Sequence, residues 1–255
     1  SHRLMDFHLK VIMKNKLKIL HLSDTHGFHD LLNIPQDIDV LAFTGDESNH
    51  RNPHLNEAEF YDFAEWFIDL PIKHKLFIVG NHSTYIFHNE KIVRDLFQKN
   101  KITWLHKSSI VIDGIKFYGD GISPRFGDWV YTTDRAKTNK HWDLIPEDTQ
   151  VLLTHTPPKG ILDISENRLH EIELVGDSAL LKKVNKLPLL KAHLFGHIHC
   201  LTPDYEVLTN NGWKFYKDVL LTDKVFNYSE VNKSLEYDSI EEIIISEYDG
   251  DMYRI

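Results

Sequence analysis

The chain has 255 residues, of which 42% are hydrophobic and 26% are charged, and 38 Asp+Glu outnumber 29 Lys+Arg to give a formal net charge of −9. This composition is that of a globular protein, and it excludes a collagen, a coiled coil and a disordered tail. The negative charge argues against binding nucleic acid through bulk positive charge. The single cysteine, Cys200, cannot form an internal disulfide, and no apolar run is long enough to cross a membrane, so we expect a cytoplasmic protein.

Histidine content and charge both change abruptly near residue 200. All 17 histidines lie between His2 and His199. Residues 200–255 contain twelve acidic and five basic residues, a net charge of −7, which leaves −2 for residues 1–199. We therefore predict two modules of different chemistry, residues 15–199 and residues 200–255, preceded by an N-terminal extension over residues 1–14.

The first module alternates short apolar runs with helical patterns, which predicts an α/β architecture. Apolar residues at helical spacing predict helices around residues 60–68 and 92–97. Asp113-Gly114 separates two short apolar runs and predicts a hairpin between residues 110–112 and 115–118. Further strands are expected over residues 17–22, 40–44, 75–79, 151–154 and 192–195.

The second module is predicted to be all-β. Residues 206–209 and 213–216 flank Asn210-Asn211-Gly212 and suit a hairpin. Residues 239–247 mix isoleucines with acids and fit either a strand or an amphipathic helix, and their β-branched content favours the strand.

A polar cluster follows each of five predicted strands. In a sheet packed against helices, loops at the strand ends converge on one rim. A carboxylate and an imidazole two positions apart can face the same pocket if the chain leaves its pleat between them. The clusters are Asp24/His26, Asp46, Asn81/His82, His155 and His197/His199.

The donor atoms of these clusters suit Mn²⁺, Fe or Zn²⁺. Each cluster alone is explained as a turn, a helix cap or a hydrogen-bonded rim histidine, but five in one chain are not expected by chance. Together they provide more ligands than one ion requires. An arrangement of two divalent ions that share one bridging carboxylate is the simplest one that uses these ligands.

The ordered pattern Asp-x-His, Gly-Asp, Gly-Asn-His, His and Gly-His-x-His resembles the calcineurin-like metallophosphoesterases, and more narrowly their MPPED-type subgroup. The resemblance covers about residues 15–199, with further support from Thr-His-Thr-Pro-Pro at residues 154–158. It implies a β-sandwich flanked by helices. It also implies dinuclear-metal-dependent hydrolysis of a small phosphoric ester, a monoester or a diester, by a metal-bridging hydroxide without a protein nucleophile.

Carried over residue by residue, the resemblance implies two metal sites that share Asp46. The first would use Asp24, His26, Asp46 and His199, and the second Asp46, Asn81, His155 and His197. His82 would lie beside the phosphate as a proton donor to the leaving group or as a stabiliser of the transition state. The chain departs from the pattern at Ser83, where the family usually has an acid that would orient His82, and this puts the efficiency of acid catalysis in doubt.

The family pattern stops directly after His199, and the further strands of its second sheet are missing. The sequence from Cys200 to Trp213 instead resembles the first block of an intein of the Hint fold, and residues 248–253 also resemble intein sequence. The resemblance implies that Cys200 is a nucleophile that attacks the carbonyl of His199. The expected Thr-x-x-His and closing His-Asn blocks are absent, so we predict that this chain alone cannot splice.

Several interpretations stay open at this level. The intein is truncated, its reading frame is cut short, or it is one half of a split intein whose partner is a C-terminal fragment supplied in trans. An alternative to an active hydrolase is an unspliced precursor with an inactive phosphoesterase domain. A nuclease or protein phosphatase ranks lower, because the sequence offers no basic groove and no arginine-rich phosphate clamp.

Overall fold

The structure is a computed structural model that describes residues 9–12, 17–166, 169, 171–199, 206–229 and 234–240. The described residues fall into two compact units, one ending at His199 and the other starting after it. In the part of the chain that the structure describes, no helix is both long enough and apolar enough to cross a membrane.

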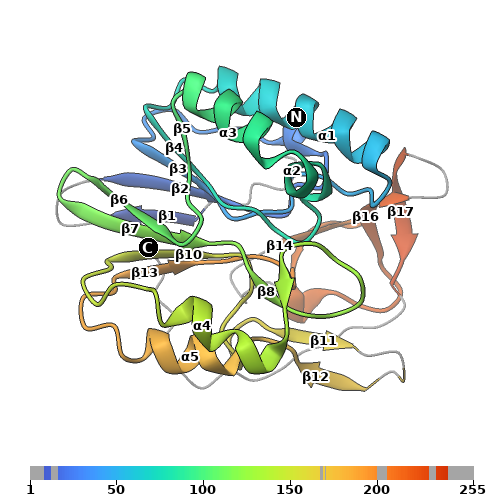
Figure 1. Cartoon of the computed structure of the whole chain (residues 1–255). Helices are drawn as coiled ribbons and strands as arrows, with labels where there is room; N and C mark the ends of the chain where they lie inside the picture. Colours follow the sequence, from blue (N-terminus) through green and yellow to red (C-terminus); the bar gives the residue numbers. More distant parts are fainter. Residues whose placement is uncertain are drawn as a thin grey trace. The chain divides into compact units, whose positions relative to one another are not determined.

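A five-stranded sheet forms the first layer of the first unit, in the spatial order β1-β2-β3-β4-β5 (Figure 1). β2 to β5 are parallel, and β1 adds an antiparallel edge by pairing with β2. Because the four parallel strands run in one direction, their carboxyl ends lie at one rim. The strands are β1 (Leu9–Ile12), β2 (Lys18–Leu22), β3 (Val40–Phe43), β4 (His74–Phe77) and β5 (Ile102–Trp104).

A second sheet of four strands has the order β13-β10-β7-β6. β13, β10 and β7 are parallel, while β6 and β7 form the hairpin predicted around Asp113-Gly114. The strands are β6 (Ser108–Ile112), β7 (Ile115–Asp120), β10 (Val151–Thr154) and β13 (Ala192–Leu194).

Alternation along the strands divides the apolar side chains between two cores. In β3, Val40 and Ala42 join a cluster that also holds Phe117 and Leu153 of the second sheet, so this cluster fills the space between the sheets. Leu41 and Phe43 point to the opposite side, into a cluster shared with helices. The arrangement is a two-sheet sandwich covered by helices on its outer faces.

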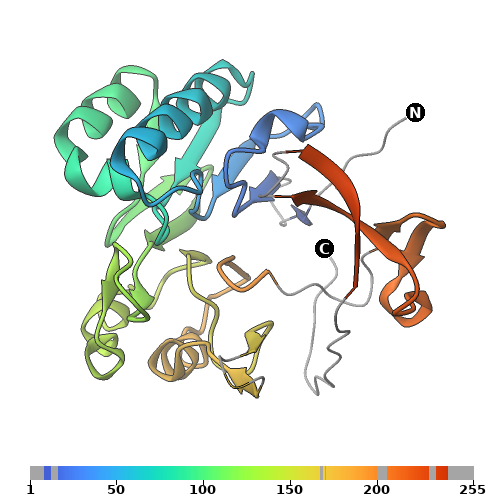
Figure 2. The ribbon, with the colours of Figure 1, turned by 90° about the vertical axis from the view of Figure 1, so that its right-hand side faces the viewer.

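Helices cover both outer sides of the sandwich, with α1 and α3 over the five-stranded sheet and α4 and α5 on the far side (Figures 1 and 2). Asn52 caps α1 by accepting hydrogen bonds from the backbone of the first turn, and Pro53 occupies the first helical position. The helices are α1 (Pro53–Asp69), α2 (Thr84–His88), α3 (Glu90–Lys99), α4 (Asn139–Trp142) and α5 (Ser178–Val184).

Shorter elements complete the first unit. Two-stranded ribbons pair β8 with β9 and β11 with β12. The elements are η1 (His29–Leu31), β8 (Ser123–Pro124), β9 (Thr132–Thr133), η2 (Arg135–Lys137), β11 (Ile164–Glu166) and β12 (Ile172–Leu174).

The second unit contains one antiparallel sheet with the order β15-β14-β16-β17. The buried carboxylate of Asp223 binds the Lys214 ammonium at 2.8 Å and the Asn211 amide at 2.8 Å, and thereby secures the first hairpin. The elements are β14 (Glu206–Thr209), β15 (Gly212–Phe215), η3 (Tyr216–Asp218), β16 (Lys224–Ser229) and β17 (Ser234–Ser239).

The predicted strands and the two long helices of the first unit are present, with shifts of a few residues at their ends. Local patterns did not predict β1, β5, the two short ribbons, α2, α4 or α5 of the first unit, nor β16 and β17 of the second. β1 falls within the predicted N-terminal extension yet pairs with β2. In the second unit, β17 ends at Ser239, and residues 241–247 of the strand predicted there lie outside the described residues.

Candidate metal centre

The predicted site residues follow the carboxyl ends of β2, β3, β4, β10 and β13. Two pairs of site residues have left-handed backbone. In the Asp-x-His pair, φ is 53° at Asp24 and 46° at His26. In the His-x-His pair, φ is 77° at His197 and 57° at His199. Asp46 also has a positive φ, of 58°. This conformation is rare for residues other than glycine. It turns the chain sharply at the end of each strand, where these side chains join the groups described below.

One group of converging side chains consists of Asp24, His26 and His199. Nε2 of His199 lies 3.1 Å from Oδ1 of Asp24. Nε2 of His26 lies 3.4 Å from Nε2 of His199 and 3.9 Å from Oδ1 of Asp24. Two imidazole nitrogens and a carboxylate oxygen thus point at a common space.

A second group consists of Asp46, His155 and His197, and Asn81 joins it. Nε2 of His155 lies 3.2 Å from Oδ2 of Asp46 and 3.0 Å from Oδ1 of Asn81. Asp46 also belongs to a third group with His26 and His82, so it lies between the other two groups.

The ring orientations of two histidines suit metal coordination. Nδ1–H of His155 donates to the carbonyl oxygen of Thr44 at 2.8 Å, and Nδ1–H of His26 donates to that of Ser48 at 3.2 Å. Because a carbonyl oxygen only accepts, Nε2 of each ring is left to face the carboxylates. A backbone partner that fixes the ligating nitrogen is typical of metal-binding histidines. The donor set and its convergence therefore fit divalent cations.

The electrostatics of the cluster favour ionised carboxylates and one charged imidazole. Burial opposes ionisation of Asp46, but the charge and hydrogen bond of His155 lower its pKa to about 2. Burial likewise opposes ionisation of Asp24, but its hydrogen bond with His199 helps to hold its pKa below the ordinary range. Burial opposes protonation of His155, yet Asp46 and Asp24 raise its pKa to about 9. Burial lowers the pKa of His197 to about 3.

Glycines allow the loops to approach this closely. A Cβ at Gly80 would overlap Oδ1 of Asp46, and a Cβ at Gly196 would overlap Oδ2 of Asp24 and Oγ of Ser23. The glycines of the Gly-Asn-His and Gly-His-x-His motifs are therefore required by contacts to the carboxylates.

His82 lies at the rim beside groups that the sequence analysis missed. Its Nδ1–H donates to the carbonyl oxygen of Asn49 at 2.7 Å, and its ring lies 4.0 Å from the Trp129 ring between centroids. The Arg51 guanidinium lies 3.6 Å from the centroid of the same Trp129 ring. Phe126 contacts the ring of His197 at 5.1 Å between centroids. No local motif marks these residues, because only the folded loops bring them to the site.

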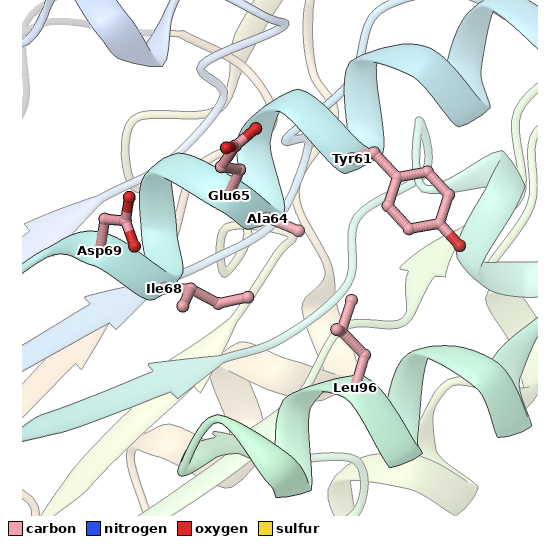
Figure 3. Close-up of a pocket in the computed structure, with 6 residues that line it drawn as sticks. All are labelled: Tyr61, Ala64, Glu65, Ile68, Asp69 and Leu96. Atoms are coloured by element: carbon pink, nitrogen blue, oxygen red, sulfur yellow. The ribbon is translucent and has the colours of Figure 1, made fainter.

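Cys200 is outside the described residues, so its predicted role receives no structural account. A hollow of about 300 Å³ lies between α1 and α3, and none of the predicted site residues lines it. Its lining is shown in Figure 3 and consists of Tyr61, Ala64, Glu65, Ile68, Asp69 and Leu96.

Comparison with known proteins gives concordant results. Residues 17–201 match the family model described as "Calcineurin-like phosphoesterase". The chain is 31% identical over 211 residues to UPF0046 protein K07C11.7 of Caenorhabditis elegans, covering 78% of this chain and 68% of that protein. It is 27% identical over 241 residues to human metallophosphoesterase domain-containing protein 1, covering 85% and 69% of the two chains.

A solved structure also resembles this chain in fold. The two share 13% sequence identity and superpose with a TM-score of 0.56, covering 87% of this chain and 98% of the other. This likeness concerns the fold alone.

Proposed function

The chain belongs to the calcineurin-like phosphoesterase family of metal-dependent phosphoester hydrolases, and we propose that it hydrolyses a small phosphoric ester with the help of two divalent cations. The substrate class is a phosphodiester or a phosphomonoester, and the cations are Mn²⁺, Fe or Zn²⁺. The net charge of −9 supports a small substrate over a nucleic acid.

The observation that carries this proposal is the convergence of the predicted ligands in three linked groups, in which His26 and Asp46 each belong to two. Asp24, His26, Asp46 and His199 would hold one cation. Asp46, Asn81, His155 and His197 would hold the other. When bound, the two cations would lower the pKa of a shared water and offset the negative charge that develops on the phosphoryl oxygens.

The chain's own residues prepare this centre. The carbonyl oxygens of Thr44 and Ser48 orient the imidazoles of His155 and His26. Asp46 also accepts a hydrogen bond from the backbone N–H of His82 at 2.8 Å, which ties the loop after β4 to the shared carboxylate. The ligand geometry is thus pre-organised by contacts between loops from different strands.

His82 is the side chain we place beside the leaving group. Because its Nδ1–H is held by Asn49, Nε2 is the atom available to the substrate. Burial lowers the pKa of His82 below its ordinary value, so Nε2 accepts hydrogen bonds in the free protein. An unprotonated Nε2 can only accept a hydrogen bond, so His82 needs a proton on Nε2 both to protonate the leaving group and to stabilise the phosphoryl charge. The negative charge of a bound phosphate favours this protonation.

The test is hydrolysis of bis(p-nitrophenyl) phosphate and p-nitrophenyl phosphate by metal-free protein titrated with Mn²⁺, with metal content measured in parallel. We expect turnover that saturates near two cations per chain and is abolished by chelation. The control variant His193→Gln removes a half-buried histidine that bonds Thr154 instead of the cluster, and it should leave turnover unchanged. Bound metal without turnover would instead favour the inactive precursor.

For residues 200–255 we propose a second, separate role as the N-terminal part of a Hint-fold intein. The second compact unit begins directly after His199, which supports a change of module at this place. In the proposed step, the sulfur of Cys200 attacks the carbonyl carbon of His199. The peptide C–N bond breaks as the C–S bond forms, and the proton of the thiol passes to the released amine.

Thiol-induced cleavage tests this second role. Incubation with excess dithiothreitol should release residues 1–199 slowly from the parent chain, and Cys200→Ala should prevent the release. Mass spectrometry identifies the fragment. An equal yield from the Cys200→Ala variant would show that cleavage is unrelated to an acyl shift.

A further inference from the structure

A buried carboxyl group, Glu47, lies directly after the shared ligand Asp46 and has no solvent exposure. Its Oε2 accepts a hydrogen bond from Oγ of Ser83 at 2.7 Å, and its Oε1 lies 3.3 Å from the donating Oγ of Ser48. Among the described residues, both side-chain partners of Glu47 are hydroxyl groups. A carboxyl group is costly to bury, so its retention beside the centre needs an explanation.

Ser83 connects this carboxyl group to the turn that carries Asn81 and His82. The backbone N–H of Gly80 donates to Oγ of Ser83 at 3.0 Å, and Ser83 is itself fully buried. The hydrogen bonds therefore run from the Gly80 amide to the Ser83 hydroxyl and on to Glu47. Each donor in this series of hydrogen bonds points toward the loop after β3.

The same turn is held on another side by Asn56 of α1. Its Nδ2 donates to the carbonyl oxygen of His82 at 2.8 Å, and its Oδ1 accepts from the backbone N–H of Tyr85 at 2.7 Å. Asn56 thus fixes the distal part of the turn. The hydroxyl and carboxyl pair fixes the part that begins at Gly80.

We infer that Glu47 and Ser83 act together as positioning residues, and that Glu47 supplies, from the loop after β3, the carboxyl group that position 83 lacks. The Ser83 hydroxyl oxygen accepts from the Gly80 amide, which leaves the hydroxyl proton to be donated to Oε2 of Glu47. The orientation of Asn81 and His82 follows from the closed turn. The expected effect on catalysis rests on the proposed function, whereas the role of Glu47 and Ser83 in holding the turn does not.

The experiment compares Glu47→Ala, Ser83→Ala, their combination, and the exchange Glu47→Ser with Ser83→Glu. We expect each single variant to lower kcat by about 10- to 100-fold with KM changed less than about threefold. The combined variant should be no worse than the worse single variant, because both remove one chain of hydrogen bonds. The exchange should recover at least about tenfold in kcat over Glu47→Ala, since it returns a carboxyl group to the same buried contact.

A readout independent of turnover accompanies the kinetics. Hydrogen exchange of the peptide that contains residues 80–83 is measured in metal-free protein, and it should become faster in both single variants while peptides of β3 and β10 stay protected. Glu147→Ala, which removes an exposed carboxylate, is the matched control and should change neither readout. If Glu47→Ala does not fold, the isosteric Glu47→Gln replaces it.

Three results would overturn the inference. The single variants would leave both kcat and hydrogen exchange unchanged, or the effects of the two single variants on kcat would multiply in the combined variant. The third result is that the variant with Glu47→Ser and Ser83→Glu is no more active than Glu47→Ala. If the wild-type chain binds metal without turnover, the proposed function fails. The rate of hydrogen exchange in the peptide that contains residues 80–83 then still decides whether Glu47 and Ser83 hold the turn.

Discussion

Binding of cations to the candidate centre should displace a proton from His155. Its Nδ1–H is committed to Thr44, so the ionisable proton lies on Nε2, between Asp46 and Asn81. A metal ligand must use the deprotonated nitrogen. Loading the centre therefore exchanges this proton for a cation.

The number of protons released can be worked out from the site. With a pKa of about 9, His155 holds about 0.97 of a proton at pH 7.5. The hydrogen bond with Asp24 also raises the pKa of His199. Asp46 is already ionised and His197 already neutral at this pH, so neither adds any. We expect release of at least about one proton, and an apparent affinity that rises at least about tenfold per pH unit from pH 6.5 to 8.5.

Titration calorimetry with Mn²⁺ in two buffers of different ionisation enthalpy measures this release. His155→Gln should lower the count by about one proton, whereas the control His193→Gln should not, because burial lowers the pKa of His193 to about 3 and leaves that ring neutral. Release of no proton, or the same release from His155→Gln and wild type, would refute this account of the centre.

Four further predictions concern the site and its support. Asp46→Asn should lower kcat/KM by about 100-fold and reduce the number of bound Mn²⁺ ions, because Asp46 lies between the ligand groups; normal metal content would contradict this. Gly196→Ala should reduce the free energy of unfolding by about 1–3 kcal/mol in urea titrations, since its Cβ would overlap Asp24, and unchanged stability would argue against that contact. Trp129→Ala should lower kcat/KM by about two- to tenfold through loss of the ring beside His82, with full activity as the opposing result. In chelator, the stability that His155 contributes, measured as the free energy of unfolding of wild type minus that of His155→Gln, should fall by about 3 kcal/mol as pH rises from 6.5 to 9, because the pKa of His155 is raised to about 9 in the folded state; a difference that does not change with pH would contradict the assignment.

Local sequence was sufficient to predict the parts of the centre. Each ligand type follows an apolar run with strand character, so the positions of Asp24, Asp46 and His155 at strand ends could be predicted before any contact was known. Parallel strands bring such ends to one rim, which is a property of the sheet and does not depend on details of the loops. The division near residue 200 was likewise visible in histidine content and charge.

Tertiary structure alone decided which other groups meet those ligands. Arg51 and Trp129 are far apart in the chain, and only the folded loops stack them beside His82. Glu47 and Ser83 are separated by 36 positions, so the carboxyl group that position 83 lacks could not be found by local pattern. The physical reason is that ligand type and strand character are local properties, whereas burial, ring stacking and hydrogen-bond partners depend on contacts between segments distant in sequence.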